Sequence, residues 1–382
     1  LQKMNKLIDI CDYVTSRTSR IENYISTENM LPNKGGVCAP SNVPSGTAIE
    51  YKSGDILISN IRPYFQKIWQ ADCNGACSAD VLCIRANNKA DSKYLYYLLS
   101  QQLFFDYVMA GAKGCKMPRG DKKQIMQWQI SLPSLAEQRR IAGILGAIDD
   151  KIENNRRINT NLELQAQALY KQWFVDFEFP NEDGKPYKSS GGKMVDSELG
   201  LIPESWSVIG YCDVVDIKGG GTPPTTNPEF WSGSIPFFTP KDVSSDCFVL
   251  KTEKSITEAG LSNCNSRLYA KNTVFITARG TVGKVVMAGC SMAMNQTNYA
   301  LIGKNGLSQY FVYLLTIALV DKLLKKANGA VFNAITTRDF EGEQIVLPTN
   351  FVLSKFIDII SPLYQQVLSI AKENETLATL RD

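Results

Sequence analysis

Apolar residues in the middle of the chain recur at alternating steps of four and three. The run begins after Leu132-Pro133, where Ser134 can cap a first turn and Glu137, three residues later, can complete a capping box. This spacing is typical of one coiled-coil seam, and it predicts a central helix over residues 134–178. The seam positions are Ile141, Leu145, Ile148, Ile152, Asn155, Asn159, Leu162, Ala166, Leu169 and Trp173.

The same seam returns 215 residues later and predicts a distal helix over residues 350–382. Even a polar seam position recurs, because Asn159 matches Asn374. A buried asparagine in a seam fixes register at a cost in stability, so we interpret the two as a device for helix pairing. The residues expected to pair the helices are Ile148, Ile152, Asn159, Leu162, Leu363, Val367, Asn374 and Leu377.

The alternative is that these are two ordinary amphipathic helices packed on separate cores. The polarity of the central helix argues against it, because charged residues leave only a narrow apolar stripe, which suits a helix partner better than a broad core. Those charged residues are Arg139, Arg140, Asp149, Asp150, Lys151, Glu153, Arg156, Arg157 and Glu163.

The repeat extends upstream of the two helices. A predicted strand at 54–59 matches one at 272–277, with Arg62 and Arg279 just beyond, and Tyr97-Leu98-Leu99 matches Tyr313-Leu314-Leu315 on a helix. Two diverged halves therefore share one fold. Within each half, short β-type runs alternate with turns and one helix precedes a glycine loop, which indicates an α+β domain.

The predicted order along the chain is domain, helix, linker, domain, helix. The first domain covers 1–133 and the second 195–349. Residues 179–194 are rich in turn formers and poor in apolar side chains, so they are interpreted as a linker. The fold class is α+β, with two similar globular domains joined by two long helices that form an antiparallel coiled coil.

Composition narrows the chemistry by exclusion. The 382 residues include no histidine, which removes histidine general bases, Ser-His-Asp and Cys-His dyads, and histidine-ligated zinc or iron. Ten cysteines are scattered, and Cys73, Cys77 and Cys83 lack a second close pair for zinc. No signal peptide or membrane-spanning run stands out. We expect a cytoplasmic chain with reduced thiols and no membrane partner.

Several partial motifs fail for want of one residue. Gly280 to Lys284 resembles the end of a phosphate loop, but Val285 replaces the serine or threonine that would hold magnesium. Lys218 to Pro223 lacks the last glycine of a dinucleotide fingerprint. We therefore expect no catalytic residue, cofactor site or metal ligand in this chain.

Binding is the remaining function class. The net charge is only +3, so a nucleic-acid surface must be a local concentration of basic residues. Such concentrations surround Gly114 and Gly329, where they would neutralise phosphates, while amide and guanidinium groups on nearby loops would read base edges. For any single residue the alternative is an ordinary solvated charge. The expected DNA-binding residues are Asn29, Asn33, Lys34, Arg62, Lys113, Lys116, Arg119, Lys241, Arg279, Lys284, Asn295, Gln296, Asn333 and Arg338.

These features resemble the specificity subunits of Type I restriction-modification enzymes. Residues 132–142, Leu-Pro-Ser-Leu-Ala-Glu-Gln-Arg-Arg-Ile-Ala, are similar to the family's helix start, and 168–174, Ala-Leu-Tyr-Lys-Gln-Trp-Phe, to the end of that helix. In the second half, Gly-Gly-Thr-Pro at 220–223, the run 230–237 and Ala-Arg-Gly-Thr-Val-Gly at 278–283 look like the family's target-recognition domains. The likeness spans almost the whole chain.

The resemblance implies a DNA-recognition subunit with no catalytic site of its own. In that family each domain reads one half of a bipartite sequence in double-stranded DNA, and the helices hold the domains apart while docking methyltransferase subunits. Restriction and motor subunits complete the enzyme. AdoMet, ATP and magnesium would then belong to the partner subunits.

One departure concerns the distal helix, which in the family usually continues past Leu-Arg-Asp. This sequence stops at Leu380-Arg381-Asp382, so the counterparts of Leu169 and Trp173 are absent, and either a truncated or a naturally short helix is expected. Two other readings stay open: a recognition subunit of a Type IIB-like restriction system, and a coiled-coil scaffold that binds no DNA.

Overall fold

The computed structural model describes residues 4–326 and 334–382. Its contacts divide the chain into two compact units. Unit 1 consists of Leu1–Lys151 with Ala378–Asp382, and unit 2 of Ile152–Leu377. The two long helices α4 (Leu135–Tyr170) and α9 (Asn350–Arg381) contribute to both units.

Unit 1 is built on a four-stranded antiparallel sheet in the order β2-β8-β5-β6. The residues of β5, Ile-Leu-Ile-Ser, are all buried, as expected of a strand covered on both faces. A three-stranded sheet, β3-β4-β7, and a two-stranded sheet, β1-β9, complete the unit. The strands are β1 (Met4–Lys6), β2 (Cys11–Tyr13), β3 (Arg17–Thr18), β4 (Ala48–Tyr51), β5 (Ile56–Ser59), β6 (Ile68–Gln70), β7 (Gly75–Cys77), β8 (Val81–Ala86) and β9 (Gln129–Ser131).

Three helices cover unit 1: α1 (Ser92–Leu99), α2 (Gln102–Ala110) and α3 (Lys122–Ile125). Two of them begin at an aspartate whose carboxylate accepts backbone N–H groups that the first turn leaves unpaired. Asp91 accepts from Tyr94 at the start of α1, and Asp121 accepts from Lys123 and Gln124 at the start of α3. The short helices are therefore fixed by caps as well as by their apolar faces.

Unit 2 repeats this plan. Its main sheet has the order β13-β20-β17-β18-β15, in which the first four strands occupy the places of β2, β8, β5 and β6, and β15 is an addition. A three-stranded sheet β16-β14-β19 and the pairs β12-β21 and β10-β11 complete it. The strands are β10 (Met194–Ser197), β11 (Gly200–Pro203), β12 (Ser207–Gly210), β13 (Val215–Gly219), β14 (Trp231–Phe238), β15 (Phe248–Val249), β16 (Lys254–Ile256), β17 (Val274–Thr277), β18 (Val285–Ala288), β19 (Ala293–Met294), β20 (Asn298–Gly303) and β21 (Gln344–Leu347).

The helices of unit 2 are α5 (Tyr211–Val214), α6 (Glu258–Ser262), α7 (Gln309–Lys326) and α8 (Thr337–Glu341), together with most of α4 and α9. Its largest core joins residues of the main sheet and α7 to aromatic residues of the two long helices. The predicted α+β class with two similar domains and two long helices is confirmed. Among the described helices, none combines the length and the apolar character that a bilayer crossing requires.

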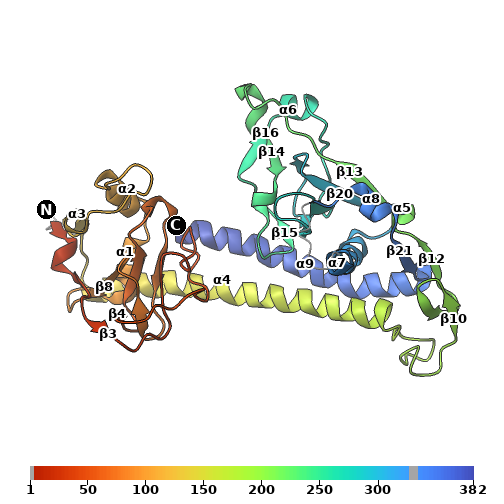
Figure 1. Cartoon of the computed structure of the whole chain (residues 1–382), viewed down its shortest axis with the longest axis horizontal. Coiled ribbons are helices and arrows are strands. Elements are labelled where there is room, and N and C mark those ends of the chain that lie inside the picture. The colour runs from red at the N-terminus through yellow and green to blue at the C-terminus, as the bar shows by residue number, and fades with distance from the viewer. Residues whose placement is uncertain (1–3, 327–333) are drawn as a thin grey trace. The chain divides into compact units, whose positions relative to one another are not determined.

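Within unit 2, α4 and α9 lie side by side and run antiparallel (Figure 1). Asn159 of α4 bonds the carbonyl of Val367, whereas Tyr170, three turns later, packs on Phe356, three turns earlier. Ser134 accepts from the N–H of Glu137 at 3.3 Å, as predicted, but the Glu137 carboxylate pairs with Arg140 at 2.6 Å instead of closing a capping box. Beyond Tyr170 the helix widens into a π-helical turn, Lys171–Val175.

The two seam asparagines each donate to a backbone carbonyl of the opposite helix. Asn159 and Asn374 do not bond each other: Asn159 donates to the carbonyl of Val367 at 3.2 Å, and Asn374 to that of Ile152 at 3.5 Å. The same 215-residue offset relates these two bonds. Asn374 is bonded instead by Asn155, whose amide donates to its Oδ1 at 2.8 Å. In an antiparallel pair, the alignment of the two helices decides which residues face each other. The 215-residue offset relates equivalent positions of the two helices and does not give that alignment.

The other residues expected to pair the helices lie along the same stripe. Ile152 and Val367 are buried, and Leu162 and Leu363 pack against the core of unit 2. Leu377 is half-buried in unit 2, and Ile148 is half-buried in unit 1.

The segment 179–194 is not an open connection. Phe179 is buried and its ring stacks on Trp206 and on Tyr187, with centroids 4.9 and 4.6 Å away. The turn formers that suggested a linker build loops between these aromatic anchors. This segment is therefore part of unit 2 rather than a spacer beside it.

Candidate nucleic-acid interface

Basic residues of unit 1 meet where the turn after β5 joins a second loop. Residues 113–119 form a hairpin closed by two backbone bonds of 2.9 Å between Lys113 and Arg119, with Gly114 at φ 99°. Arg119 also forms a backbone bridge with Ile61, and the N–H of Arg62 donates to Pro118 at 2.8 Å. The structure thus brings together Arg62, Lys113, Lys116 and Arg119, four of the predicted residues.

Two of these four cations are paired with acids. Lys113 lies 2.9 Å from Asp121; this contact raises the pKa of the lysine and lowers the pKa of Asp121 to about 2. Arg119 lies 3.2 Å from Asp80. The side chains of Arg62 and Lys116 are exposed and make no ion pair with any residue that the structure describes. The net positive charge of this surface therefore comes mainly from these two.

The corresponding part of unit 2 is the turn between β17 and β18. Arg279 and Lys284 are exposed on this turn, in which Gly280 and Gly283 both have φ 81°. These left-handed positions favour glycine, since a Cβ is strained there. A backbone bridge from Arg279 to Ala334 joins the turn to the segment that leads into α8, where Arg338 is exposed.

The two turns form equivalent backbone bridges, and these bridges show which residues of the two turns correspond. The bridge Ile61–Arg119 of unit 1 corresponds to Arg279–Ala334 of unit 2, so Arg279 matches Ile61. Arg62 matches Gly280, and both have positive φ, 50° and 81°. The two arginines that follow the matched strands therefore occupy adjacent positions of equivalent turns.

A third group follows the ends of β14 and β19, which run parallel with Phe238 beside Met294. The N–H of Asn295 donates to Phe238, and Ala278 donates to Thr297 at 2.9 Å. Asn295 and Gln296 therefore lie next to the Arg279 turn. Lys241 follows β14 in the short helix η5 (Pro240–Asp242) and is exposed, 4.0 Å from Glu253.

Two predicted base readers are occupied within the protein. Asn29 is 3% exposed, and its amide donates to the carbonyls of Tyr24 and Cys38 while its Oδ1 accepts from Ser26. Asn295 uses its Oδ1 to accept from Thr297 and from Asn298 at 2.6 Å. Both amides hold loops in shape. Asn29 is buried in this structure, so its amide is not placed to reach a base.

The remaining predicted residues have mixed positions. Asn33 and Lys34 have left-handed backbones, and Asn33 donates its N–H to Phe65. Lys34 lies 3.7 Å from Asp382. Gln296 is exposed and accepts from the hydroxyl of Thr222. Asn333 and Gly329 lie outside the described residues.

Sequence reasoning missed two exposed aromatic side chains. Tyr64 and Phe65 stand on the turn between β5 and β6, directly after Arg62 and Pro63. The sequence feature that could have identified them is Pro-Tyr-Phe between two short apolar strands. Aromatic residues in a tight polar turn have no strand face on which to pack, so their rings are expected to be exposed.

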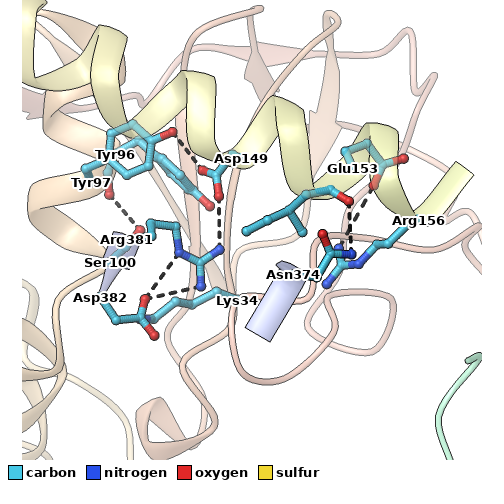
Figure 2. A network of polar contacts seen from close by, with 11 residues as sticks. Lys34, Tyr96, Tyr97, Ser100, Asp149, Glu153, Arg156, Asn374, Arg381 and Asp382 are labelled. Atoms are coloured by element: carbon cyan, nitrogen blue, oxygen red, sulfur yellow. Dashed lines mark hydrogen bonds and ion pairs between the residues drawn. The ribbon is translucent and has the colours of Figure 1, made fainter. Parts of the chain in front are cut away.

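A separate polar cluster in unit 1 links α1, α4 and the last turn of α9 (Figure 2). Asp149 of α4 accepts from Tyr97 at 2.7 Å and from Arg381 at 3.0 Å. Burial, followed by the bond to Asp149, raises the pKa of Tyr97. The cluster borders a cavity of about 540 Å³, also lined by Lys34, Tyr94 and Ile141.

Comparisons with known proteins agree with this architecture. The family described as the Type I restriction modification DNA specificity domain matches residues 12–164 and 203–379, each a domain followed by a long helix. The HindI specificity subunit of Haemophilus influenzae is 26% identical over 420 residues, covering 94% of this chain and 91% of that protein. The MjaIX specificity subunit of Methanocaldococcus jannaschii is 27% identical over 296 residues, covering 76% of this chain and 66% of that protein.

A solved structure supports the fold independently of sequence. The S subunit of a Type I restriction-modification system from M. genitalium aligns with a TM-score of 0.52 at 14% identity, covering 100% of this chain and 94% of that one. Because the family matches twice and spans most of the sequence, the chain belongs to the family of Type I restriction-modification DNA specificity subunits.

Proposed function

We propose that the chain recognises a bipartite sequence in double-stranded DNA, with one half-site read by each unit. The observation that carries the proposal is the repeated edge: the bridges Ile61–Arg119 and Arg279–Ala334 build the same junction in both units, and each junction carries exposed basic side chains. Two similar readers in one chain suit a target of two parts.

Phosphate neutralisation is the proposed role of the exposed cations. Arg62 and Lys116 serve unit 1, whereas Arg279, Lys284 and Arg338 serve unit 2. Such contacts position a protein on the duplex and make its affinity fall steeply with salt. Gln296, beside the Arg279 turn, is the amide best placed to read a base edge in unit 2.

Recognition is, in this proposal, the whole contribution of the chain. Methyl transfer and cleavage belong to methyltransferase and to restriction and motor subunits, which supply the sites for AdoMet, ATP and magnesium. Helices α4 and α9 set the unread spacer and dock the methyltransferase subunits. The support is the row of exposed residues along both helices, which leaves a face of each available to partners.

The modular reading is tested by exchanging residues 195–349 for the equivalent domain of a relative. The complex with methyltransferase subunits is then used to methylate DNA, and sequencing of the methylated bases gives the target. We expect one half-site to change and the other to remain. A change in both half-sites would contradict independent readers.

The basic surface is tested by DNA binding of the full chain at several salt concentrations. Replacing both Arg62 and Lys116 with alanine should lower the slope of log K against log salt by about 0.9 per lost phosphate contact. The matched control replaces Lys185 and Lys188, which are also exposed but lie outside both junctions. An unmodified chain that binds no DNA at low salt would instead support the coiled-coil scaffold.

A further inference from the structure

The turn between β5 and β6 presents two aromatic rings to solvent. Tyr64 is 47% and Phe65 37% exposed, and their ring centroids lie 4.6 Å apart at an angle of 53°. Large aromatic side chains usually contribute to cores, so an adjacent exposed pair marks a contact surface more often than a lone exposed residue does.

The backbone of this turn is fixed from several sides. The residues that flank the short helix η2 (Pro63–Phe65), Arg62 and Gln66, have left-handed φ values of 50° and 49°. Arg62 donates to Pro118, while the carbonyls of Phe65 and Gln66 accept from the loop at 33–34, at 2.8 and 3.0 Å. A left-handed backbone at two non-glycine residues costs conformational energy, and such strain persists where the surrounding contacts enforce it. The rings are therefore held outward on a rigid support.

The surroundings of the rings are cationic. Arg62 lies two residues before Tyr64, and Lys116 and Arg119 lie on the loop bonded to their turn. The Lys67 ammonium is 5.9 Å from the Phe65 ring. Asp80 and Asp121 face Arg119 and Lys113 and leave Arg62 and Lys116 unneutralised within the described residues. Lysine is depleted in contacts between proteins. An apolar tip inside a basic rim suits a polyanion that carries flat bases.

Unit 2 lacks this feature at the equivalent place. Its β17–β18 turn contains Gly280, Thr281, Val282 and Gly283 between Arg279 and Lys284. The cations are retained in both units, whereas the aromatic pair is found only in unit 1. Any role of the rings is thus restricted to the half-site that unit 1 reads.

We propose that Tyr64 and Phe65 read the shape of the first half-site, by placing a ring against or between the bases of one step of the duplex. This inference rests on the proposed function. Aromatic and apolar wedges unstack base steps, and flexible pyrimidine–purine steps yield most easily. The rings therefore select a deformable step, while Arg62 and Lys116 hold the adjoining phosphates.

The test uses the full chain and a duplex that contains both half-sites, with 2-aminopurine placed at successive positions of the first. In the wild type, fluorescence should rise at one step as the base there unstacks. The double variant Y64A/F65A should lose that rise and bind about five- to 150-fold more weakly, because stacking on one base contributes about 1–3 kcal/mol and 1.4 kcal/mol is tenfold. Tyr64→Phe, which keeps the ring, should retain both signals.

Two controls separate the possible outcomes. Phe351→Ala removes an aromatic ring of unit 2 that is 62% exposed beneath Lys355, and it should leave binding and fluorescence unchanged. Y64L/F65L keeps an apolar wedge on the turn without planar rings. A folded chain, judged by circular dichroism, should therefore keep part of the fluorescence rise but lose the affinity that ring stacking contributes.

If the wild type binds no DNA, the proposed function fails. If the wild type binds and Y64A/F65A binds equally well with the same fluorescence, only the present inference fails. A variant that binds DNA normally but no longer assembles with methyltransferase subunits would identify the turn as a protein contact and would also overturn the inference.

Discussion

Each unit attaches a helix of its domain to the long helices through a tyrosine at an equivalent position, but the two attachments use different chemistry. In unit 2, Tyr313 of α7 is 2% exposed; it donates to Glu163 of α4 at 2.6 Å, and its ring meets Tyr364 of α9 edge-on. In unit 1, Tyr97 of α1 donates to Asp149, which is also bonded by Arg381. One repeated geometry is thus held by aromatic packing in one unit and by charge in the other.

The difference extends to the space around each tyrosine. In unit 2, Phe356 is fully buried among rings of the π-helical end of α4, with Phe174 4.7 Å and Trp173 5.5 Å away. Its counterpart in unit 1, by the 215-residue offset, is Ile141, which lines the 540 Å³ cavity. Repetition of a fold therefore does not repeat its energetics: unit 2 gains stability from dry packing, and unit 1 relies on contacts that solvent can weaken.

The largest expected effect is the loss of the aromatic core. Phe356→Ala should lower the free energy of unfolding of unit 2 by about 3–5 kcal/mol, because a fully buried ring is removed and a cavity remains. The matched change in unit 1, Ile141→Ala, should cost only about 1 kcal/mol, since that side chain already borders a cavity. Native-state hydrogen exchange, followed on peptides of each unit, measures both. Equal losses would mean that the two attachments are energetically alike.

A smaller effect is expected from the polar attachment. Arg381 and Asp149 are partly buried, with side-chain exposures of 28% and 32%, so their coupling should be about 1 kcal/mol and should shrink with salt. A double-mutant cycle of Arg381→Ala and Asp149→Asn, read from hydrogen exchange of unit 1 at low and high salt, isolates it. The pair Tyr313→Phe and Glu163→Gln in unit 2 serves as the comparison. A coupling energy in unit 1 that did not change with salt would contradict the ionic interpretation.

The smallest effect concerns pH in unit 2. Burial raises the pKa of Glu163, opposed by its bonds from Tyr313 and Gln167. A carboxyl group whose folded pKa is raised contributes stability below its unfolded value, about 4.3, and that contribution is lost as pH rises through the folded pKa. Glu163→Gln should therefore flatten this part of the pH dependence while keeping an acceptor for Tyr313. The free energy of unfolding, measured with urea between pH 4 and 8, checks this. The same pH dependence in the wild type and in Glu163→Gln would contradict a raised pKa of Glu163.

Much of the architecture was accessible from sequence because its signals are local and repeated. The heptad spacing from Ile141 to Trp173, and its return 215 residues later, predicted both long helices. The expected ranges 134–178 and 350–382 compare with Leu135–Tyr170, continued by the π-helical turn to Val175, and with Asn350–Arg381. Strands 54–59 and 272–277 contain β5 and β17. The spacing of apolar residues predicts such elements, and tertiary contacts mainly change the residues at which they end.

The site was less accessible because tertiary contacts decide it. Sequence placed Arg62, Lys113, Lys116 and Arg119 in neighbouring loops, and the structure brings them together. It gave no sign that Asn29 is buried, that Arg62 has a left-handed backbone, or that Asn155 rather than Asn159 bonds Asn374. Each depends on which segment lies opposite, and Phe179 shows the same for a segment whose composition suggested a linker.

The pair of bonds from Asn159 to Val367 and from Asn374 to Ile152 has a consequence in symmetry. Each of the two asparagines donates to a backbone carbonyl of the opposite helix. Reciprocal contacts of this kind are the self-complementary contacts of a twofold dimer, and here they occur within one chain. Sliding one helix along the other displaces both donors from their carbonyls together. Register errors therefore lose two hydrogen bonds at once, so the register of the helix pair is specified at two separate points along it.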